Sequence, residues 1–323
     1  MPPTSPAPRA TRRLARRCKP RRPRFRNGSA GTARPPRAPK RERSIVRGVH
    51  RRPSQIEGTA LDLGLSNSVA VVTGGSSGIG LATAKILIAE GARVAICGRD
   101  AARLAAAKEK LDAIKPGAAL AEVCDVLNAD AVKAFADKVA AWGGSKLDLL
   151  VNNAGQGRVS TFANTTDAQW REELDLKFFS QILPIRAFKP LLDAAPAPAI
   201  VAVNSLLSLQ PEAHMVCTSA ARAGVQNLLK SLATEFAPHI RVNTILIGLV
   251  DSGQWQRRFE ARTDKTQTRE AWYGALARDK KIPLQRLGEP EEPARAIVFL
   301  GSQAASYITG ASLEISGGVS RFI

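Results

Sequence analysis

The fold of this chain is decided by Ser68-Val-Ala-Val-Val-Thr-Gly-Gly-Ser-Ser-Gly-Ile-Gly80, which runs straight into an apolar helical segment over residues 81–90. Residues 69–72 are a short apolar, mostly β-branched run, which is typical of a buried parallel strand. The glycines that follow mark a tight turn. Strand, turn and helix in this order predict a nucleotide site, because the free N–H groups at the start of the helix face an anion.

Three glycines in this turn have separate physical roles. Gly74 can take up backbone angles that are closed to other residues, and Gly78 lets the main chain approach a pyrophosphate. Gly80 lets the helix pack close to the strand. The sequence therefore predicts that the turn holds the diphosphate of a dinucleotide.

The charge of the chain is concentrated in its first sixty residues. The 323 residues have a formal net charge of +19, and residues 1–60 contribute +16 of it through 16 Arg and 2 Lys against two Glu. The same segment holds ten of the 20 prolines and little apolar periodicity, so it cannot bury enough surface to offset its ordering entropy. We expect residues 1–58 to be a disordered basic extension and residues 59–323 to be the folded domain.

Four further interpretations of the basic extension stay open. It could be an arm that binds nucleic acid, an Arg-rich transit peptide, an anchor on anionic lipid, or the product of a start site assigned too far upstream. Phe25 is its one aromatic residue, and it has no apolar stretch or clear cleavage site. These features favour plain disorder or a misplaced start, and we expect no nucleic-acid partner.

The length of the apolar stretches and the spacing of the cysteines indicate the cell compartment of the protein. No stretch approaches the roughly 20 apolar residues that span a bilayer, and no signal peptide is visible. The sequence therefore predicts a soluble, cytoplasmic protein without membrane contact. Its four cysteines lack metal-type spacing, so we expect reduced thiols and no metal site.

Further motifs follow the glycine-rich turn. Thr73–Gly80 reads Thr-Gly-x-x-x-Gly-x-Gly, Asn152–Gly155 reads Asn-Asn-Ala-Gly, and a strand over residues 199–205 ends in Ser205. Over roughly residues 61–323 the chain resembles the short-chain dehydrogenases/reductases. Because strands alternate with helices throughout, we expect an α/β fold with one doubly wound parallel sheet. The resemblance implies a single Rossmann domain with seven strands in the order 3-2-1-4-5-6-7 and a ligand cleft at their carboxyl ends.

The resemblance also implies a nicotinamide cofactor. Asp125, in a strand expected over residues 118–126, matches the family acid that bonds the adenine amino group. Main-chain groups near Gly248 would meet the nicotinamide carboxamide, and the Ser252 hydroxyl would contact it or a phosphate. The residues expected to bind the cofactor are Thr73, Gly74, Ser76, Ser77, Gly78, Ile79, Gly80, Arg99, Asp125, Val126, Asn152, Ala154, Gly155, Arg222, Gly248 and Ser252.

The end of the second strand, residues 93–97, bears on the choice between NADP and NAD. It has no acidic side chain that could bond the adenosine ribose of NAD. Arg99 follows instead, and its planar, always charged donor fork suits the 2′-phosphate of NADP. Asp100 is expected to cap the helix over residues 101–114. We therefore predict NADP as the preferred cofactor, with NAD as the alternative.

The catalytic motif departs from the family pattern at three positions. Ser205 matches the family serine that hydrogen-bonds the substrate carbonyl or hydroxyl. Thirteen residues on, Thr218 replaces the family tyrosine, and four residues later Arg222 replaces the family lysine. In a long helix expected over residues 167–194, Lys177 takes the place of a family asparagine that holds a relay water. These four residues form the candidate catalytic group.

The replacement of tyrosine removes the usual acid of the family. A phenol with a pKa near 10 can be shifted toward 7 by an adjacent cation at about 1.36 kcal/mol per unit, but an aliphatic hydroxyl is far too weak an acid. Arg222 can hold the nicotinamide ribose but is no acid near neutral pH. Lys177 is the first substitute donor, because a desolvated lysine falls toward a pKa of about 7, and His214 is the second. A water relay, substrate-assisted chemistry or an absence of turnover stay open.

The remaining segments bear on substrate binding and on self-association. Residues 251–281 are polar, carry four aromatic side chains including Tyr273, and fit either a helical lid over the substrate or a small core of the lid itself. Tyr307 falls where the family places a structural aromatic. The helices over residues 167–194 and 215–236 are those that pack between subunits in the family, so a homodimer or homotetramer is expected.

The sequence thus favours an NADP-preferring oxidoreductase that interconverts a small-molecule carbonyl and an alcohol by hydride transfer. Ser205 would orient the substrate, Arg222 the cofactor ribose, and Thr218 would contribute a hydroxyl of weakened role. Two alternatives are kept, because fold alone does not license function. One is a cofactor-binding protein without redox turnover that acts as a sensor or partner subunit, and the other is a nucleic-acid-associated protein that uses the basic extension.

Overall fold

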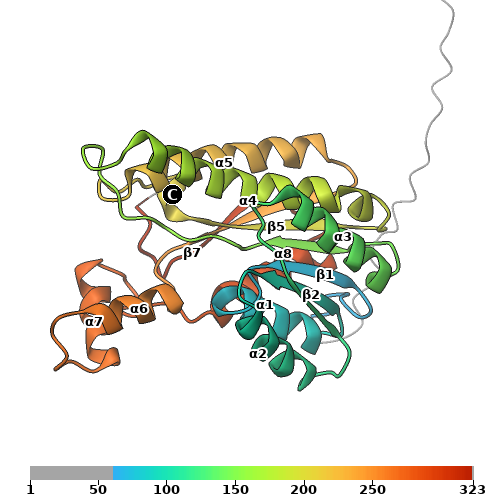
Figure 1. Ribbon diagram of the computed structural model, residues 1–323, viewed down its shortest axis with the longest axis horizontal. Coiled ribbons are helices and arrows are strands. Elements are labelled where there is room, and N and C mark those ends of the chain that lie inside the picture. The colour runs from blue at the N-terminus through green and yellow to red at the C-terminus, as the bar shows by residue number, and fades with distance from the viewer. Residues whose placement is uncertain (1–60, 322–323) are drawn as a thin grey trace, which may run out of the picture. The chain divides into compact units, whose positions relative to one another are not determined.

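The computed structural model describes residues 61–321, so the prediction for residues 1–58 lies outside the described residues. Its strands are β1 (Val69–Thr73), β2 (Arg93–Gly98), β3 (Ala119–Val123), β4 (Leu149–Asn152), β5 (Ala199–Ser205), β6 (Arg241–Ile247) and β7 (Ser312–Ile315). They form one sheet in the order β3-β2-β1-β4-β5-β6-β7, and every neighbouring pair is parallel (Figure 1). The predicted seven-stranded, doubly wound sheet is confirmed.

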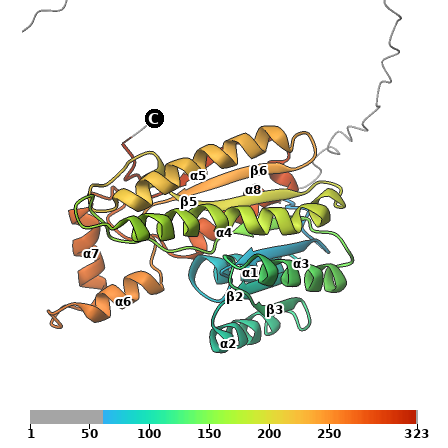
Figure 2. The same ribbon diagram turned by 45° about the horizontal axis from the view of Figure 1, so that its top comes forward.

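Helices cover both faces of this sheet. One face is covered by α1 (Gly78–Ala89), α2 (Ala101–Asp112) and α8 (Glu291–Gly301). The other is covered by α3 (Ala129–Gly143), α4 (Asp167–Asp193) and α5 (Val216–Glu235), as Figure 2 shows. Within residues 61–321, no helix is both long enough and apolar enough to cross a bilayer.

The first strand shows why both faces need a cover. Val69 and Val71 point into the core beneath α3, α4 and α5, whereas Ala70 and Val72 point into the core beneath α1, α2 and α8. Successive side chains of a strand alternate between its faces, so a strand that is apolar throughout must be covered twice. All five residues of β1 are buried accordingly.

Two element boundaries differ from the sequence prediction near the site. Helix α1 begins at Gly78 rather than at residue 81, so Gly78 and Gly80 belong to its first turn. Strand β3 ends at Val123 rather than at residue 126, and Asp125 lies in the turn that follows. There the Asp125 Oδ1 accepts a hydrogen bond from Leu127 N at 3.0 Å. Such local side-chain bonds compete with strand pairing, which explains the early end of β3.

A polar brace joins the carboxyl ends of β1 and β4. The Asn153 Nδ2 donates to Thr73 O at 3.0 Å and to Gly74 O at 3.1 Å. In return, the Thr73 Oγ1 accepts from the main-chain N–H groups of Asn153 and Ala154, each at 3.0 Å. The Asn-Asn-Ala-Gly motif therefore acts as a structural brace between the two central strands.

The lid segment forms two short helices, α6 (Gly253–Ala261) and α7 (Arg269–Asp279), with an aromatic cluster of their own. The Trp272 ring centroid lies 6.2 Å from that of Trp255 and 5.8 Å from that of Phe259. Tyr273 adds a third contact with Trp272 at 5.5 Å, and its hydroxyl donates to Asp251 Oδ1 at 2.7 Å. Figure 1 shows the pair standing to one side of the sheet. The aromatic residues thus form a small core of the lid.

The Asn153 brace gives a direct test of the fold. Replacing Asn153 by alanine should lower the free energy of unfolding by about 2 kcal/mol, because the carbonyls of Thr73 and Gly74 lose their donor. Asn164→Ala is the matched control, since Asn164 is exposed and its side chain makes no hydrogen bond within residues 61–321. Urea denaturation measures both variants, and an equally small loss in the two would contradict the brace.

Candidate active site

The candidate site lies at the edge of the sheet where the strands end. β1 leads into the glycine-rich turn, β5 ends in Ser205, and β6 leads into Gly248. Because the strands are parallel, their carboxyl ends share one edge of the sheet. The fold thereby brings together motifs that lie far apart in the sequence.

The start of α1 has the features of an anion site. Gly74 and Gly78 have φ angles of 64° and 53°, in the region that favours glycine. A Cβ on Gly78 would meet nothing within 4 Å, so the main chain there faces open space. Ser77, the N-cap residue, makes no side-chain cap bond, and the first turn has no acidic residue. The main-chain N–H groups of this first turn have no side-chain cap and lie at the positive end of the helix dipole. They therefore fit a diphosphate.

The other residues of the turn support its shape. A Cβ on Gly80 would lie 2.4 Å from Gly74 O and 2.6 Å from Asn153 Nδ2, so the close approach expected of Gly80 is present. The Thr73 side chain is committed to the brace, and the Ile79 side chain belongs to the core. Thr73 and Ile79 can therefore meet a cofactor through main-chain atoms only.

The end of β2 presents a free cation. Arg99 is exposed, and it has no ion pair or hydrogen bond within the part of the chain that the structure describes. Asp100 is the N-cap of α2, as predicted: it accepts from Arg103 N at 2.9 Å and pairs with the Arg103 Nε at 2.9 Å. Ser76 lies beside this strand end, its Oγ 3.3 Å from where a Cβ on Gly98 would stand. Arg99 and Ser76 thus offer donors where an acidic side chain is missing.

Three candidate residues lie at the end of β4 or just after it, and they differ in the groups that they can present to a ligand. Asn152 is fully buried, and its Nδ2 donates to Gln181 O of α4 at 3.4 Å, so its side chain is turned toward α4. Ala154 packs against the core beneath α3, α4 and α5. A Cβ on Gly155 would meet nothing within 4 Å, so its main chain borders open space. Of the three, Gly155 is the best placed for a ligand.

The remaining cofactor candidates lie in loops. Asp125 bonds its own turn, and Val126 is almost entirely buried. Gly248 packs against the end of β7, where a Cβ would lie 2.9 Å from Ser316 Cα. Ser252 is the N-cap of α6, and its side chain makes no cap bond.

Two of the four candidate catalytic side chains, Lys177 and Thr218, meet at a buried carboxylate that the sequence analysis did not single out. Glu173 lies one turn before Lys177 on α4, and its Oε1 accepts from the Lys177 Nζ at 2.7 Å. The same oxygen accepts from the Thr218 hydroxyl. Lys177 also donates to Gln156 O at 2.5 Å. The side chains of Glu173 and Lys177 are only 3% and 5% exposed, so this contact is shielded from water.

Arg222 lies on α5, and its side chain contacts Asn204, which precedes Ser205 on β5. Its Nη1 donates to Asn204 Oδ1 at 3.1 Å, and the Asn204 Nδ2 donates back to Arg222 O at 3.1 Å. Burial lowers the pKa of Arg222 to about 10, while the charge of Glu173 acts against that shift. Its Nε is buried and has no partner among the described residues. Arg222 is thus a cation at neutral pH with a donor to spare.

The surroundings of Lys177 make it a weaker base than an ordinary lysine. Its pKa falls to about 8, first because of burial and next because of the positive charge of Arg222. Arg158, in the loop between β4 and α4, lowers it further, whereas Glu173 raises it. This is the range in which a side chain can give and take a proton near neutral pH.

A count of donors separates the candidate acids. The Lys177 ammonium has three N–H donors, of which Glu173 and Gln156 take two. Thr218 has one, and both acceptors within its reach are protein oxygens, on Glu173 and Arg158. The Ser205 Oγ accepts from Leu207 N at 3.3 Å, which leaves its hydrogen free. Lys177 and Ser205 therefore each keep one hydrogen that no described protein atom accepts.

The other possible proton donors lie apart from this cluster. His214 is half exposed and pairs with Glu212 at 3.2 Å. Tyr273 donates to Asp251 in the lid, and Tyr307 is fully exposed. None of the three makes a hydrogen bond or ion pair with Lys177, Thr218 or Arg222 within the described residues.

Three residues of the cluster were not predicted from sequence. Glu173 carried a usable signal, because a Glu four residues before a Lys forms a pair on one helix face. Arg158, whose main-chain N–H donates to the Thr218 Oγ1 at 3.2 Å, carried none, and neither did Asn204. Their positions depend on how the loop after β4 and the end of β5 meet α5.

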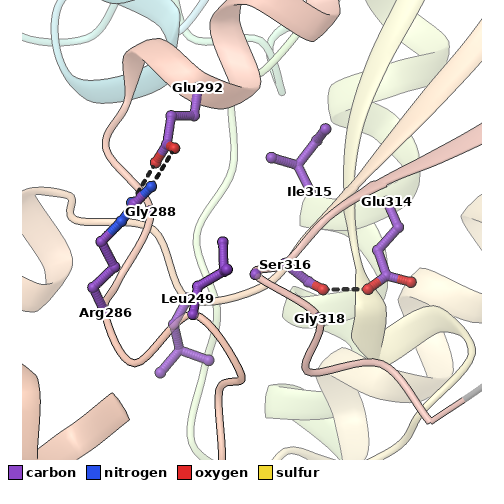
Figure 3. A pocket seen from close by; sticks show the side chains of 10 residues that line it. Leu249, Arg286, Gly288, Glu292, Glu314, Ile315, Ser316 and Gly318 are labelled. Atoms are coloured by element: carbon purple, nitrogen blue, oxygen red, sulfur yellow. Dashed lines mark hydrogen bonds and ion pairs between the residues drawn. The ribbon is translucent and has the colours of Figure 1, made fainter.

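A separate cavity of about 250 Å³ lies between the ends of β6 and β7 and the start of α8 (Figure 3). Its charged side chains are occupied: Arg286 pairs with Glu292 at 2.7 Å, and Glu314 accepts from Ser316. None of the candidate catalytic residues lines it. The cavity therefore does not define the active site.

The buried lysine gives a pH test of stability. The folded-state pKa of Lys177 is about 8 and its ordinary value is 10.5, so between these values the unfolded chain binds more protons. Between about pH 7 and about pH 9.5, the free energy of unfolding should therefore rise by about 2 kcal/mol relative to Glu173→Gln/Lys177→Met. The cost of the charged lysine is fully present only well below pH 8 and is lost as the pH rises toward 10.5.

Urea denaturation across this range measures the difference. The double variant removes both charges together, so neither partner is left buried alone. Lys189→Met is the matched control, because Lys189 lies on the same helix, is partly exposed and pairs with Asp193. Lys189→Met should show the same rise in the free energy of unfolding as the wild type. If this free energy changed with pH in parallel for the wild type and the double variant, the shifted pKa would be refuted.

Comparisons with known proteins show the family of the chain. The family model for enoyl-(acyl carrier protein) reductases matches residues 74–320. The chain is 34% identical over 257 residues to galactitol 2-dehydrogenase (L-tagatose-forming) of Cereibacter sphaeroides, an alignment that covers 79% of this chain and 95% of that protein.

Solved structures extend the comparison. A short-chain oxidoreductase from Pseudomonas aeruginosa PAO1 containing an atypical catalytic center is similar in its apo form (59% identity, TM-score 0.78, 80% of this chain and 100% of that chain). Its NADPH-bound form is 58% identical with a TM-score of 0.76, over 80% and 99%. L-Sorbose reductase from Gluconobacter frateurii, complexed with NADPH and L-sorbose, is 31% identical with a TM-score of 0.77, over 81% and 100%. The chain belongs to the short-chain dehydrogenase/reductase family of oxidoreductases.

Proposed function

We propose that the protein is an NADP-preferring oxidoreductase that interconverts a small-molecule carbonyl and an alcohol, with Lys177 as its proton donor. The observation that carries this proposal is the buried Lys177 ammonium. It is linked through Glu173 to Thr218, the position where the family has its tyrosine, and it keeps one N–H free. A shielded cation with a lowered pKa is a group of the kind that catalysis requires.

The dinucleotide would lie across the carboxyl edge of the sheet. The uncapped start of α1 and the open space at Gly78 fit its diphosphate, and Gly155 borders the same edge. Arg99 and Ser76 offer donors to a 2′-phosphate, and Asp100, the acid that follows Arg99, is committed to its helix. NADPH in the Pseudomonas and Gluconobacter structures supports this choice of cofactor.

Each catalytic side chain has a separate task in reduction. NADPH, when bound, would supply the hydride. Ser205 would donate its free hydrogen to the carbonyl oxygen and orient the substrate, while Arg222, whose Nε has no partner among the described residues, would hold the cofactor ribose. Lys177 would give one proton to the oxygen, which becomes a hydroxyl, and solvent would reprotonate the neutral amine after the product leaves. Thr218, whose hydroxyl is bonded to protein oxygens, fixes the cluster.

One observation favours a second candidate function. The Thr218 hydroxyl is turned to Glu173, so the tyrosine position offers no acid. A protein that binds the cofactor without turnover and acts as a sensor or partner subunit would have the same arrangement. A panel of ketoses, cyclic ketones and acyl ketones with NADPH separates the two, because the second candidate binds NADPH and consumes none.

Self-association stays part of the proposal. Leu174 and Phe179 of α4 are 38% and 40% exposed, which leaves apolar surface on the helix that we expect between subunits. A homodimer or homotetramer would cover it. The segment 251–281, with its own aromatic core, would close over the substrate.

The cofactor preference has a sharp test at Arg99. Arg99→Ala should weaken NADPH binding by about tenfold or more, because a charge-assisted bond to the 2′-phosphate is lost, and should leave NADH binding unchanged. Arg103→Ala is the matched control: it lies four residues on, is exposed, and pairs with Asp100. Fluorescence titration with both nucleotides measures the effect. An equal loss for NADH and NADPH would refute the assigned role.

The proton donor is tested at Lys177. Lys177→Met should lower kcat for the best carbonyl of the panel by about 10²-fold or more, since a positioned acid contributes that much, while NADPH affinity stays within a few fold. Lys189→Met, on the same helix, should keep wild-type turnover. Absorbance of NADPH follows the reaction. Full activity of Lys177→Met would exclude Lys177 as the donor.

A further inference from the structure

Glu173 is a buried acid that touches two of the candidate catalytic positions. It is 2% exposed, and its Oε1 accepts from both the Lys177 Nζ and the Thr218 hydroxyl. The two contacts come from different helices, α4 and α5. Glu173 therefore ties together the residues that replace the family asparagine and the family tyrosine.

A buried ion pair of this kind is not explained by stability. Taking two charges out of water is costly, and well-packed apolar residues of similar volume are often at least as stable. The pair sits inside the candidate site, where buried ionisable groups are most often functional. This points to a role for the carboxylate in the reaction.

The charges around Lys177 show what that role is. Arg222 from α5 and Arg158 from the loop before α4 both lower the pKa of Lys177, as burial does. Glu173, on its own helix, is the anion that acts against them. Without it, the ammonium would face two like charges in a shielded place and would lose its proton at lower pH.

The geometry adds a second effect. Because Glu173 and Gln156 take two of the three N–H donors, the direction of the third is fixed. The Thr218 hydroxyl is fixed by the same oxygen. A defined donor direction is what proton transfer to a bound substrate requires.

We propose that Glu173 is a positioning residue that holds the Lys177 ammonium and the Thr218 hydroxyl in place and sets the highest pH at which Lys177 can donate a proton. The inference rests on the proposed function, because it assumes that Lys177 is the donor. Glu173 itself gives up no proton. It acts through Lys177.

The test is the pH profile of carbonyl reduction by the full chain with NADPH. In the wild type, kcat/KM should fall as pH rises through the pKa of Lys177, since the donor is then neutral. Glu173→Gln keeps the shape and removes the charge, so this fall should move to lower pH by about one unit or more. KM for NADPH should stay within a few fold.

The neighbouring residue provides a matched control. Glu172 is 62% exposed and pairs with Arg158 at 2.8 Å. Glu172→Gln makes the same chemical change one residue away, and solvent screening should leave the profile within about 0.3 unit. Glu173→Asp keeps the charge on a shorter side chain, so its kcat should fall while the position of the profile stays near that of the wild type.

The outcomes separate the two proposals. Turnover that survives Lys177→Met overturns the proposed donor. A profile that Glu173→Gln leaves unmoved, in an enzyme that needs Lys177, overturns this inference alone. If Glu173→Gln does not fold, Glu173→Asp decides: unchanged kcat contradicts the positioning role, and lower kcat with an unmoved profile supports it.

Discussion

The parallel pairing of β1 with β4 is the constraint on which the rest of this molecule depends. β1 has β2 on one side and β4 on the other, so the chain leaves the two central strands in opposite directions. Their carboxyl ends stay side by side because Asn153 and Thr73 bond across the junction. The crevice that this reversal opens is where α/β sheets bind their ligands. The glycine-rich turn, Ser205 and α4 all reach the crevice from elements fixed by the same pairing.

The chemistry depends on how firmly α4 is held. The helix begins in a reciprocal cap between Thr166 and Gln169 and buries Phe188 and Leu192 in the core. A buried ion pair on such a helix cannot relax into water, so its geometry is maintained without ordering at each turnover. The buried pair of charges therefore costs stability, and it fixes the direction of the donor. An exposed pair on the same helix, such as that of Lys189 and Asp193, offers no such control.

The replacement of tyrosine by threonine changes more than one side chain. Tyrosine is both a large ring and an acid, whereas Thr218 is small and binds a carboxylate. In the proposed mechanism, a lysine from another helix, made less basic by burial and by Arg222, takes over the role of the acid. The Lys177 position followed from the sequence register. Its burial by α5 and by the loop before α4 came from the tertiary structure.

The sequence by itself determined the parallel sheet, the glycine-rich turn and the cap by Asp100, because periodicity and turn chemistry act over a few residues. The strand order followed from the resemblance to the family. The sequence also placed Ser205, Thr218, Arg222 and Lys177 in register. Tertiary structure alone decided that Glu173 joins two of them, and that the Asn152 side chain faces α4. Electrostatic surroundings are the sum of groups brought together from distant parts of the chain. A pKa therefore belongs to the folded arrangement, and no local pattern encodes it.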